Sequence, residues 1–373
     1  MGKKKRIILP PDSPAWANQT AFRIAERSWK RRTIPAQLRE TLLDPGGDCT
    51  AALDSGQLRR VDLAEDPRKL CRGFGANGEA ATAYAVRDIP GLVVIPGLFS
   101  GPAQAGVVRA CLAEYTAHPN VTNLDTHWRL PASGLWGLYE RERNGLDVDV
   151  LEMRHDGKVP SVKEEGYGDV PDQNATDEKV RIDPPTTATH YLKAMTASQA
   201  LPRLRWTSLG FQYNWSNKTY HLDRHAPMPV LIDELCGAVV AAIANLTAYP
   251  AEKWKSEAGI VNFYQLRDLL MAHQDRSEEN SEAPLVSFSF GNSCIFLIGT
   301  DSRDDIPTPI LLRSGDVLVM HGASRRAFHS VPRILENTIP EYLAPEHIDD
   351  KEWPPFYEYL KDARVNVNVR QVF

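Results

Sequence analysis

The sequence predicts an α+β fold in which a jelly-roll core is flanked by helices. Helical spacing of apolar residues occurs at 100–115 and at 229–246, and the chain beyond it turns into short apolar runs separated by turn residues. Several short strands after helices indicate a barrel or a double-sheet sandwich with helices packed outside it, such as a jelly roll. No repeat period is visible.

The first 85 residues are expected to form a basic extension wrapped on the core, with a short helix near 21–31. Residues 1–32 hold nine Lys or Arg against Asp12 and Glu26, a balance of +7, so a net charge of -5 leaves -12 for the remainder. A basic arm on an acidic body can contact phosphates. A solvated tail or a nuclear-import signal is an equal alternative.

Composition favours a folded, soluble, intracellular protein. Hydrophobic residues make up 42% and charged residues 24% of the chain, which is ordinary for globular proteins. Neither a secretion signal nor an apolar stretch of about 18 residues is present, so we expect no membrane association. The five cysteines include no C-x-x-C pair and indicate reduced thiols. We expect a monomer in the nucleus or cytoplasm, with the mitochondrion as an alternative.

The earlier elements follow in order along the chain. An apolar run predicts a strand at 91–96, and a helix follows it, with Ser100 as its cap and Pro102 in its first turn. Residues 141–202 are polar and rich in Pro and Thr, which predicts a long insertion or loop. This insertion is either a substrate lid or a disordered segment without a role. Residues 229–246 then predict a helix with one buried face.

The later part of the chain predicts the strands of the core. Short apolar runs bounded by turn residues predict strands at 259–266, 284–291, 294–299, 310–320 and 364–373.

Three H-x-D pairs are candidates for two ligands of a metal ion. A facial triad of two histidines and one carboxylate takes two ligands spaced i and i+2 on one strand and a third from elsewhere. The composition alone predicts roughly one such pair by chance. The three pairs are His221/Asp223, His273/Asp275 and His347/Asp349.

The sequence context favours the pair His273/Asp275. No histidine follows His347 to complete a set, and His221 lies in a polar stretch that resembles a turn. His273 follows a predicted strand, and His329 comes 56 residues later, after three more predicted strands. In a barrel, that separation can return the chain to the same mouth. A hydrogen-bonded surface histidine is the alternative for His273.

The C-terminal strand alternates strictly between polar residues and valine. Arg364, Asn366, Asn368 and Arg370 therefore share one face, and three valines share the other. Two arginines on one face suit a buried acidic ligand, because a guanidinium group binds a carboxylate through two parallel hydrogen bonds. The alternative is an ordinary half-buried strand whose polar face meets water.

With these residues in place, the chain resembles the AlkB family of nucleic-acid dealkylating oxygenases, especially the group of the first eukaryotic homologue. The resemblance covers about residues 92–373. It is densest in WTSLGFQYNW at 206–215, AGIVNFY at 258–264, HQDRSE at 273–278, SGD at 314–316 with SRRAFH at 324–329, and RVNVNVRQV at 364–372. Five motifs in the same order are far more specific than any one of them.

The resemblance implies a double-stranded β-helix and a dioxygenase domain over residues 86–373 that uses Fe(II), 2-oxoglutarate and O2. It implies that iron is held by His273, Asp275 and His329 and that the far carboxylate of 2-oxoglutarate rests on Arg364. The residues implied to line the rest of that pocket are Asn262, Tyr264, Asn366 and Arg370. A strand-end amide and a packed tyrosine are the alternatives for Asn262 and Tyr264.

The reaction implied by the resemblance is oxidative demethylation of bases such as N6-methyladenine in DNA or 1-methyladenine in RNA. Its products are formaldehyde, succinate and CO2. A base reaches a buried metal only from a single-stranded, bulged or flipped nucleotide. Trp206 and Tyr213, in a segment expected to be a loop, are candidates for stacking on it, with core packing as the alternative. Phosphates are expected to meet the basic arm, Arg203, Arg205 or Lys218.

One position departs from the family pattern. Bacterial members carry a second acidic residue two positions after the metal aspartate, and here Ser277 stands there and Glu278 follows. Arg325 matches an arginine that partners this acid and also belongs to the catalytic set. Ser277, Glu278 and Arg325 are thus candidate substrate contacts. Two other functions stay open: a protein or small-molecule hydroxylase on the same scaffold, and a catalytically silent binding module.

Overall fold

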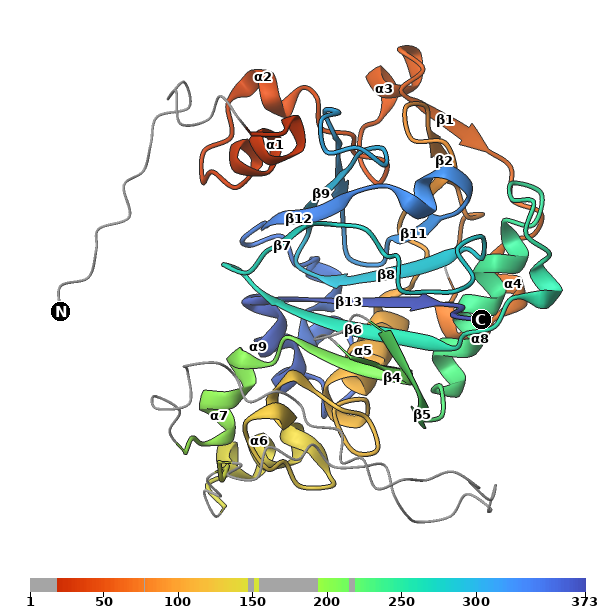
Figure 1. The fold of residues 1–373 in the computed structure, drawn as a ribbon. Helices are drawn as coiled ribbons and strands as arrows, with labels where there is room; N and C mark the ends of the chain where they lie inside the picture. Colours follow the sequence, from red (N-terminus) through yellow and green to blue (C-terminus); the bar gives the residue numbers. More distant parts are fainter. Residues whose placement is uncertain (1–18, 77, 147–150, 154–193, 215–218) are drawn as a thin grey trace.

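Two antiparallel sheets form the centre of the computed structural model, which describes residues 19–373 except 77, 147–150, 154–193 and 215–218 (Figure 1). The larger sheet has the strand order β1 (Leu58–Val61), β2 (Ala83–Val86), β3 (Leu92–Ile95), β11 (Val317–Met320), β8 (Leu285–Gly291), β13 (Ala363–Arg370), β6 (Ala258–Gln265), β4 (Trp206–Asn214), β5 (Thr219–His225). The smaller sheet has the order β10 (Thr308–Leu312), β9 (Cys294–Ile298), β12 (His329–Ile334), β7 (Leu270–His273). The predicted α+β fold with a jelly-roll core is confirmed.

Helices pack outside the two sheets (Figure 1). They are α1 (Ala21–Trp29), α2 (Ala36–Arg39), α3 (Thr50–Asp54), α4 (Pro67–Leu70), α5 (Gly101–Arg109), α6 (Gly134–Arg143), α7 (Ala197–Ala200), α8 (Val230–Ala242) and α9 (Pro354–Lys361). The predicted helices near 21–31, after Ser100 and over 229–246 are confirmed as α1, α5 and α8. Ser100 caps α5 as expected, since its side chain accepts a hydrogen bond from the amide of Ala103.

Apolar residues fill three layers. Between the large sheet and the helices α5, α6, α8 and α9 lie the fully buried Val365, Val367 and Val369, which the alternation of β13 predicted. A second cluster, which includes Phe296 and Met320, lies between the two sheets. A third covers the outer face of the small sheet, where α1 packs on β9 and β10. The functional cavity described below opens within the second layer.

Two predictions of local structure are wrong. Residues 310–320 do not form one strand, because the turn at Gly315, with φ of +86°, divides them into β10 in the small sheet and β11 in the large one. Residues 206–213 and the described part of the stretch around His221 are not loop and turn, because they form the paired strands β4 and β5. β4 is a strand because its backbone pairs with β6, a long-range contact that local sequence does not reveal.

The N-terminal segment contributes two strands to the large sheet. β1 pairs with β2, and β2 pairs with β3, so the boundary expected at residue 85 falls inside β2. The basic residues 3–6, Lys218 and most of the insertion expected at 141–202 lie outside the described residues. Over the part of the chain that the structure covers, no helix has both the length and the apolar character needed to span a membrane.

Two glycines are expected to respond in opposite directions to replacement by alanine. Gly210 in β4 has φ of +66°, and a Cβ there would lie 2.1 Å from the carbonyl oxygen of Glu257. Gly210→Ala should therefore lower the free energy of unfolding by about 3 kcal/mol. Gly237 is exposed within α8, and a Cβ there meets no atom within 4 Å. Gly237→Ala should raise the free energy of unfolding by roughly 1 kcal/mol. Urea denaturation measures both, and equal midpoints for the two variants would contradict this account.

Candidate functional site

The three side chains that were predicted from the sequence as metal ligands lie close together at one end of the small sheet. One donor atom from each of His273, Asp275 and His329 lies within 4.8 Å of the others, and no other such group occurs among the described residues. His273 ends β7 and His329 begins β12, and the two residues face each other in the antiparallel pairing. Their ring centroids are 4.3 Å apart. Asp275 lies just beyond β7, with its Oδ1 3.7 Å from Nε2 of His273.

The imidazole rings are oriented by backbone carbonyl groups. Nδ1 of His273 lies 3.0 Å from the carbonyl oxygen of Met271, and Nδ1 of His329 lies 3.1 Å from that of Ala327. A proton donated from Nδ1 leaves the lone pair on Nε2, which is the form that binds a metal. Burial, and then the neighbouring His273, lower the pKa of His329 to about 4, so its ring is neutral near pH 7.

The carboxylate of Asp275 remains ionised although it is buried. Burial raises its pKa, but the guanidinium of Arg370 leads the opposing positive charges, which hold the pKa below its usual range. Its Oδ2 lies 3.5 Å from Nη1 of Arg370 and accepts no hydrogen bond from any described residue. Two imidazoles and one ionised carboxylate with an unsatisfied oxygen fit Fe(II). The donor set therefore suits the metal that the resemblance implies.

The other two H-x-D pairs do not form such a set. Nδ1 of His221 lies 3.8 Å from Oδ1 of Asp223 on β5, but no described residue supplies a third donor there. His347 and Asp349 likewise belong to no group of three donors in the described part of the chain.

A cavity of about 620 Å³ lies between the sheets and contains the three candidate ligands. Its polar wall is the face of β13 that carries Arg364, Asn366, Asn368 and Arg370, and the neighbouring strand β6 adds Asn262 and Tyr264. The polar face of β13 thus meets a cavity rather than open water.

Arg364 lies deep in this cavity and is only 1% exposed. Its Nη1 donates to the carbonyl oxygen of Asn292 at 3.1 Å and its Nη2 to Oγ of Ser289 at 2.6 Å. Its buried Nε donates to no described residue. A buried guanidinium with an unsatisfied donor fits the carboxylate of a small acidic ligand such as 2-oxoglutarate.

The neighbours of Arg364 are suited to the same ligand. Burial raises the pKa of Tyr264, so its hydroxyl remains a proton donor. Nδ2 of Asn366 donates to Oγ of Ser287 at 2.8 Å and to the carbonyl oxygen of Phe288 at 2.9 Å. Nδ2 of Asn262 donates to Oδ1 of Asn366 at 3.5 Å. These bonds fix both amides at the cavity wall.

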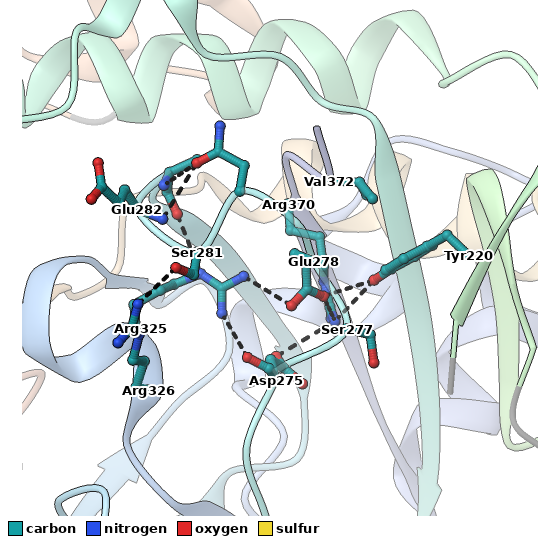
Figure 2. A network of polar contacts seen from close by, with 12 residues as sticks. Tyr220, Asp275, Ser277, Glu278, Ser281, Glu282, Arg325, Arg326, Arg370 and Val372 are labelled. Carbon is teal, nitrogen blue, oxygen red and sulfur yellow. Dashed lines mark hydrogen bonds and ion pairs between the residues drawn. The ribbon is translucent and has the colours of Figure 1, made fainter. Parts of the chain in front are cut away.

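Arg370 lies at the end of the cavity that contains the three candidate ligands, beside Asp275. Figure 2 shows the ion pairs around it. Its Nη1 lies 3.0 Å from Oε1 of Glu278, and Nη2 of Arg325 lies 3.2 Å from the other oxygen of Glu278. The hydroxyl of Tyr220 also donates to Oε1 of Glu278 at 2.8 Å. Glu278 therefore links two arginines one position after the place where bacterial members carry their acid.

The structure separates the candidate substrate contacts into two groups. Tyr213, Ser277 and Glu278 line the cavity, and the hydroxyl groups of Tyr213 and Ser277 are 2.8 Å apart. Arg325 and Trp206 do not line it. The side chains of Arg325 and Glu278 are each 1% exposed, and Arg325 reaches the site only through Glu278 and through the backbone carbonyl of Asp275.

The sequence interpretation missed Tyr220 and Arg303. Tyr220 lies on β5 with its ring centroid 5.1 Å from that of Tyr213 on β4, so a predicted hairpin could have placed it. Arg303 lines the cavity from the segment between β9 and β10, and its guanidinium lies 4.6 Å above the ring of Phe328. No pattern in the neighbouring sequence predicts that Arg303 lines this cavity.

Comparisons with known proteins agree with this geometry. The profile of the 2OG-Fe(II) oxygenase superfamily matches residues 168–370. The chain is 33% identical over 306 residues to the nucleic acid dioxygenase ALKBH1 of Mus musculus, covering 78% of this chain and 66% of that relative, slightly less than two thirds. It is 31% identical to the tRNA demethylase abh1 of Schizosaccharomyces pombe, covering 94% and 95%. It is 28% identical to the DNA N(6)-methyladenine demethylase ALKBH1A of Arabidopsis thaliana, covering 96% and 97%.

Proposed function

We propose, from the premise that this chain belongs to the 2OG-Fe(II) oxygenase superfamily and within it to the AlkB homologue 1 group, that it oxidatively removes methyl groups from bases of nucleic acid. The observation that carries the proposal is the convergence of His273, Asp275 and His329 in one cavity with Arg364. The names of the relatives support nucleic acid as the substrate class.

In this proposal one end of the cavity binds the metal ion and the other end binds the co-substrate. His273, Asp275 and His329 would hold Fe(II), and Arg364 with Tyr264 would bind the far carboxylate of 2-oxoglutarate. When bound, Fe(II), 2-oxoglutarate and O2 supply an oxidant for a C–H bond and release succinate and CO2, and a hydroxylated N-methyl group leaves as formaldehyde. Arg370 keeps Asp275 ionised, so the carboxylate is available to the metal.

The remaining lining residues shape the place for the substrate. Phe296, Leu318 and Met320 make part of the wall apolar, which limits water near the reacting carbon. Tyr213 and Ser277 offer a ring and hydroxyl groups where a base would enter. A base can reach them only when it is unpaired or flipped from its stack. The proposal covers DNA and RNA alike, in the nucleus or cytoplasm, with the mitochondrion as the alternative location.

Single-stranded oligonucleotides that carry N6-methyladenine or 1-methyladenine are expected to yield formaldehyde and the unmodified base. The same strands in a fully paired duplex should react more slowly, because unpairing a base requires a few kcal/mol. Mass spectrometry of a panel of modified DNA and RNA strands measures both products, with His273→Ala as the inactive control. Succinate formation without conversion of any strand would favour a protein or small-molecule hydroxylase instead.

A further inference from the structure

The strand that ends in His273 lies at the edge of the small sheet. β7 pairs with β12 on one side, and none of the described strands pairs with its other side. An edge strand presents unpaired amide and carbonyl groups and frays more easily than a central strand. A metal ligand at the end of such a strand needs some other support if its position is to be fixed.

Two side chains from distant parts of the sequence bond the free edge of β7 at Ala272, the residue before His273. Oε1 of Glu26 in α1 accepts a hydrogen bond from the amide of Ala272 at 2.8 Å. Nη2 of Arg303 donates to the carbonyl oxygen of Ala272 at 2.9 Å. They take the two hydrogen bonds that a neighbouring strand would make at this residue.

These two side chains are themselves held in place. Phe22 and Trp29 of α1 are buried against the outer face of the small sheet, where Figure 1 shows α1 beside β9 and β12. The amide of Phe22 donates to the carbonyl oxygen of Arg303 at 3.0 Å. Nη1 of Arg23 lies 2.9 Å from Oε2 of Glu26, which leaves Oε1 for Ala272. Helix α1, Arg303 and the end of β7 therefore form one connected unit.

We propose that Glu26 and Arg303 are positioning residues that fix His273 for metal binding. The inference rests on the proposed metal site, which Glu26 itself does not contact. Bonds to the amide and carbonyl groups of Ala272 fix the backbone that precedes His273, and so fix the direction of its side chain. Residues that orient a metal ligand typically change metal affinity by about 10- to 100-fold when they are replaced.

The test compares Glu26→Ala with Glu26→Gln in the full chain by anaerobic titration with Mn(II), followed by hydrogen exchange of residues 270–273. Glu26→Ala removes the acceptor and should weaken Mn(II) binding about tenfold and speed exchange of the Ala272 amide. Glu26→Gln keeps an oxygen acceptor and should bind Mn(II) within about threefold of wild type. Ser28→Ala in the same helix removes only a hydrogen bond to the carbonyl oxygen of Ile24 and is the matched control, expected to behave like the wild-type protein.

Arg303→Met provides an independent route if Glu26→Ala does not fold. Arg303 is exposed, so the chain should fold, and loss of the bond to Ala272 should again weaken Mn(II) binding. Wild-type affinity and unchanged exchange in folded Glu26→Ala, or wild-type affinity in Arg303→Met, would overturn the inference. His273→Ala separates this result from the proposed function: if it retains Mn(II) binding, the metal site itself is misplaced.

Discussion

His273→Ala should abolish metal binding and turnover. The variant removes one of three donors, and the remaining pair, Asp275 and His329, lacks the third that a facial site requires. Under anaerobic conditions, Fe(II) with 2-oxoglutarate should give a weak visible charge-transfer band in the wild-type protein and no such band in His273→Ala. Turnover should fall to the level seen after a chelator has removed the metal.

The chain offers a matched control for this prediction. His347 belongs to another H-x-D pair but lies exposed on the surface, outside the group of donors. His347→Ala should keep the band, the metal affinity and the turnover of the wild-type protein. An unchanged spectrum in His273→Ala would place the metal elsewhere and contradict the proposed function.

Arg364→Lys should weaken binding of 2-oxoglutarate strongly while the metal site stays intact. Lysine keeps the positive charge but cannot offer two parallel donors while it also bonds Ser289 and the carbonyl of Asn292. Loss of one or two charge-assisted hydrogen bonds corresponds to about 2–3 kcal/mol, or a rise in the KM for 2-oxoglutarate of roughly 30- to 150-fold. Steady-state kinetics at saturating Fe(II) measures this change.

A second ligand shows whether Arg364 acts on the far carboxylate. 2-Oxobutyrate keeps the keto-acid end of 2-oxoglutarate but lacks that carboxylate. Its affinity should be nearly the same for the wild-type protein and for Arg364→Lys, whereas the affinity for 2-oxoglutarate should differ. Equal losses for both ligands would mean that the substitution disturbs the cavity as a whole.

The parts of the site that could be predicted from the sequence are those that regular backbone geometry determines. Strict alternation from Arg364 to Arg370 placed four polar side chains on one face of a strand, and the structure turns that face to the cavity. The i, i+2 spacing of His273 and Asp275 required only that the backbone be extended there. The third candidate ligand, His329, was expected because a separation of 56 residues can return the chain to the same mouth of a barrel.

The parts that could not be predicted depend on contacts between distant segments. Strand β5 has a largely exposed, polar pattern, so its existence rests on pairing with β4 rather than on burial of its own residues. Glu26 and Ala272 are separated by 246 residues, and nothing near Glu26 in the sequence indicates its partner. The pairing of Glu278 with both Arg325 and Arg370 likewise required the folded chain.

The two ends of the cavity differ in their access to solvent. The side chain of His273 is 35% exposed, whereas Arg364, in the same cavity, is 1% exposed. The end of the cavity at His273 is therefore more open to solvent than the end at Arg364. In the proposed reaction we accordingly expect the keto acid to bind before the nucleic-acid strand and succinate to leave after it.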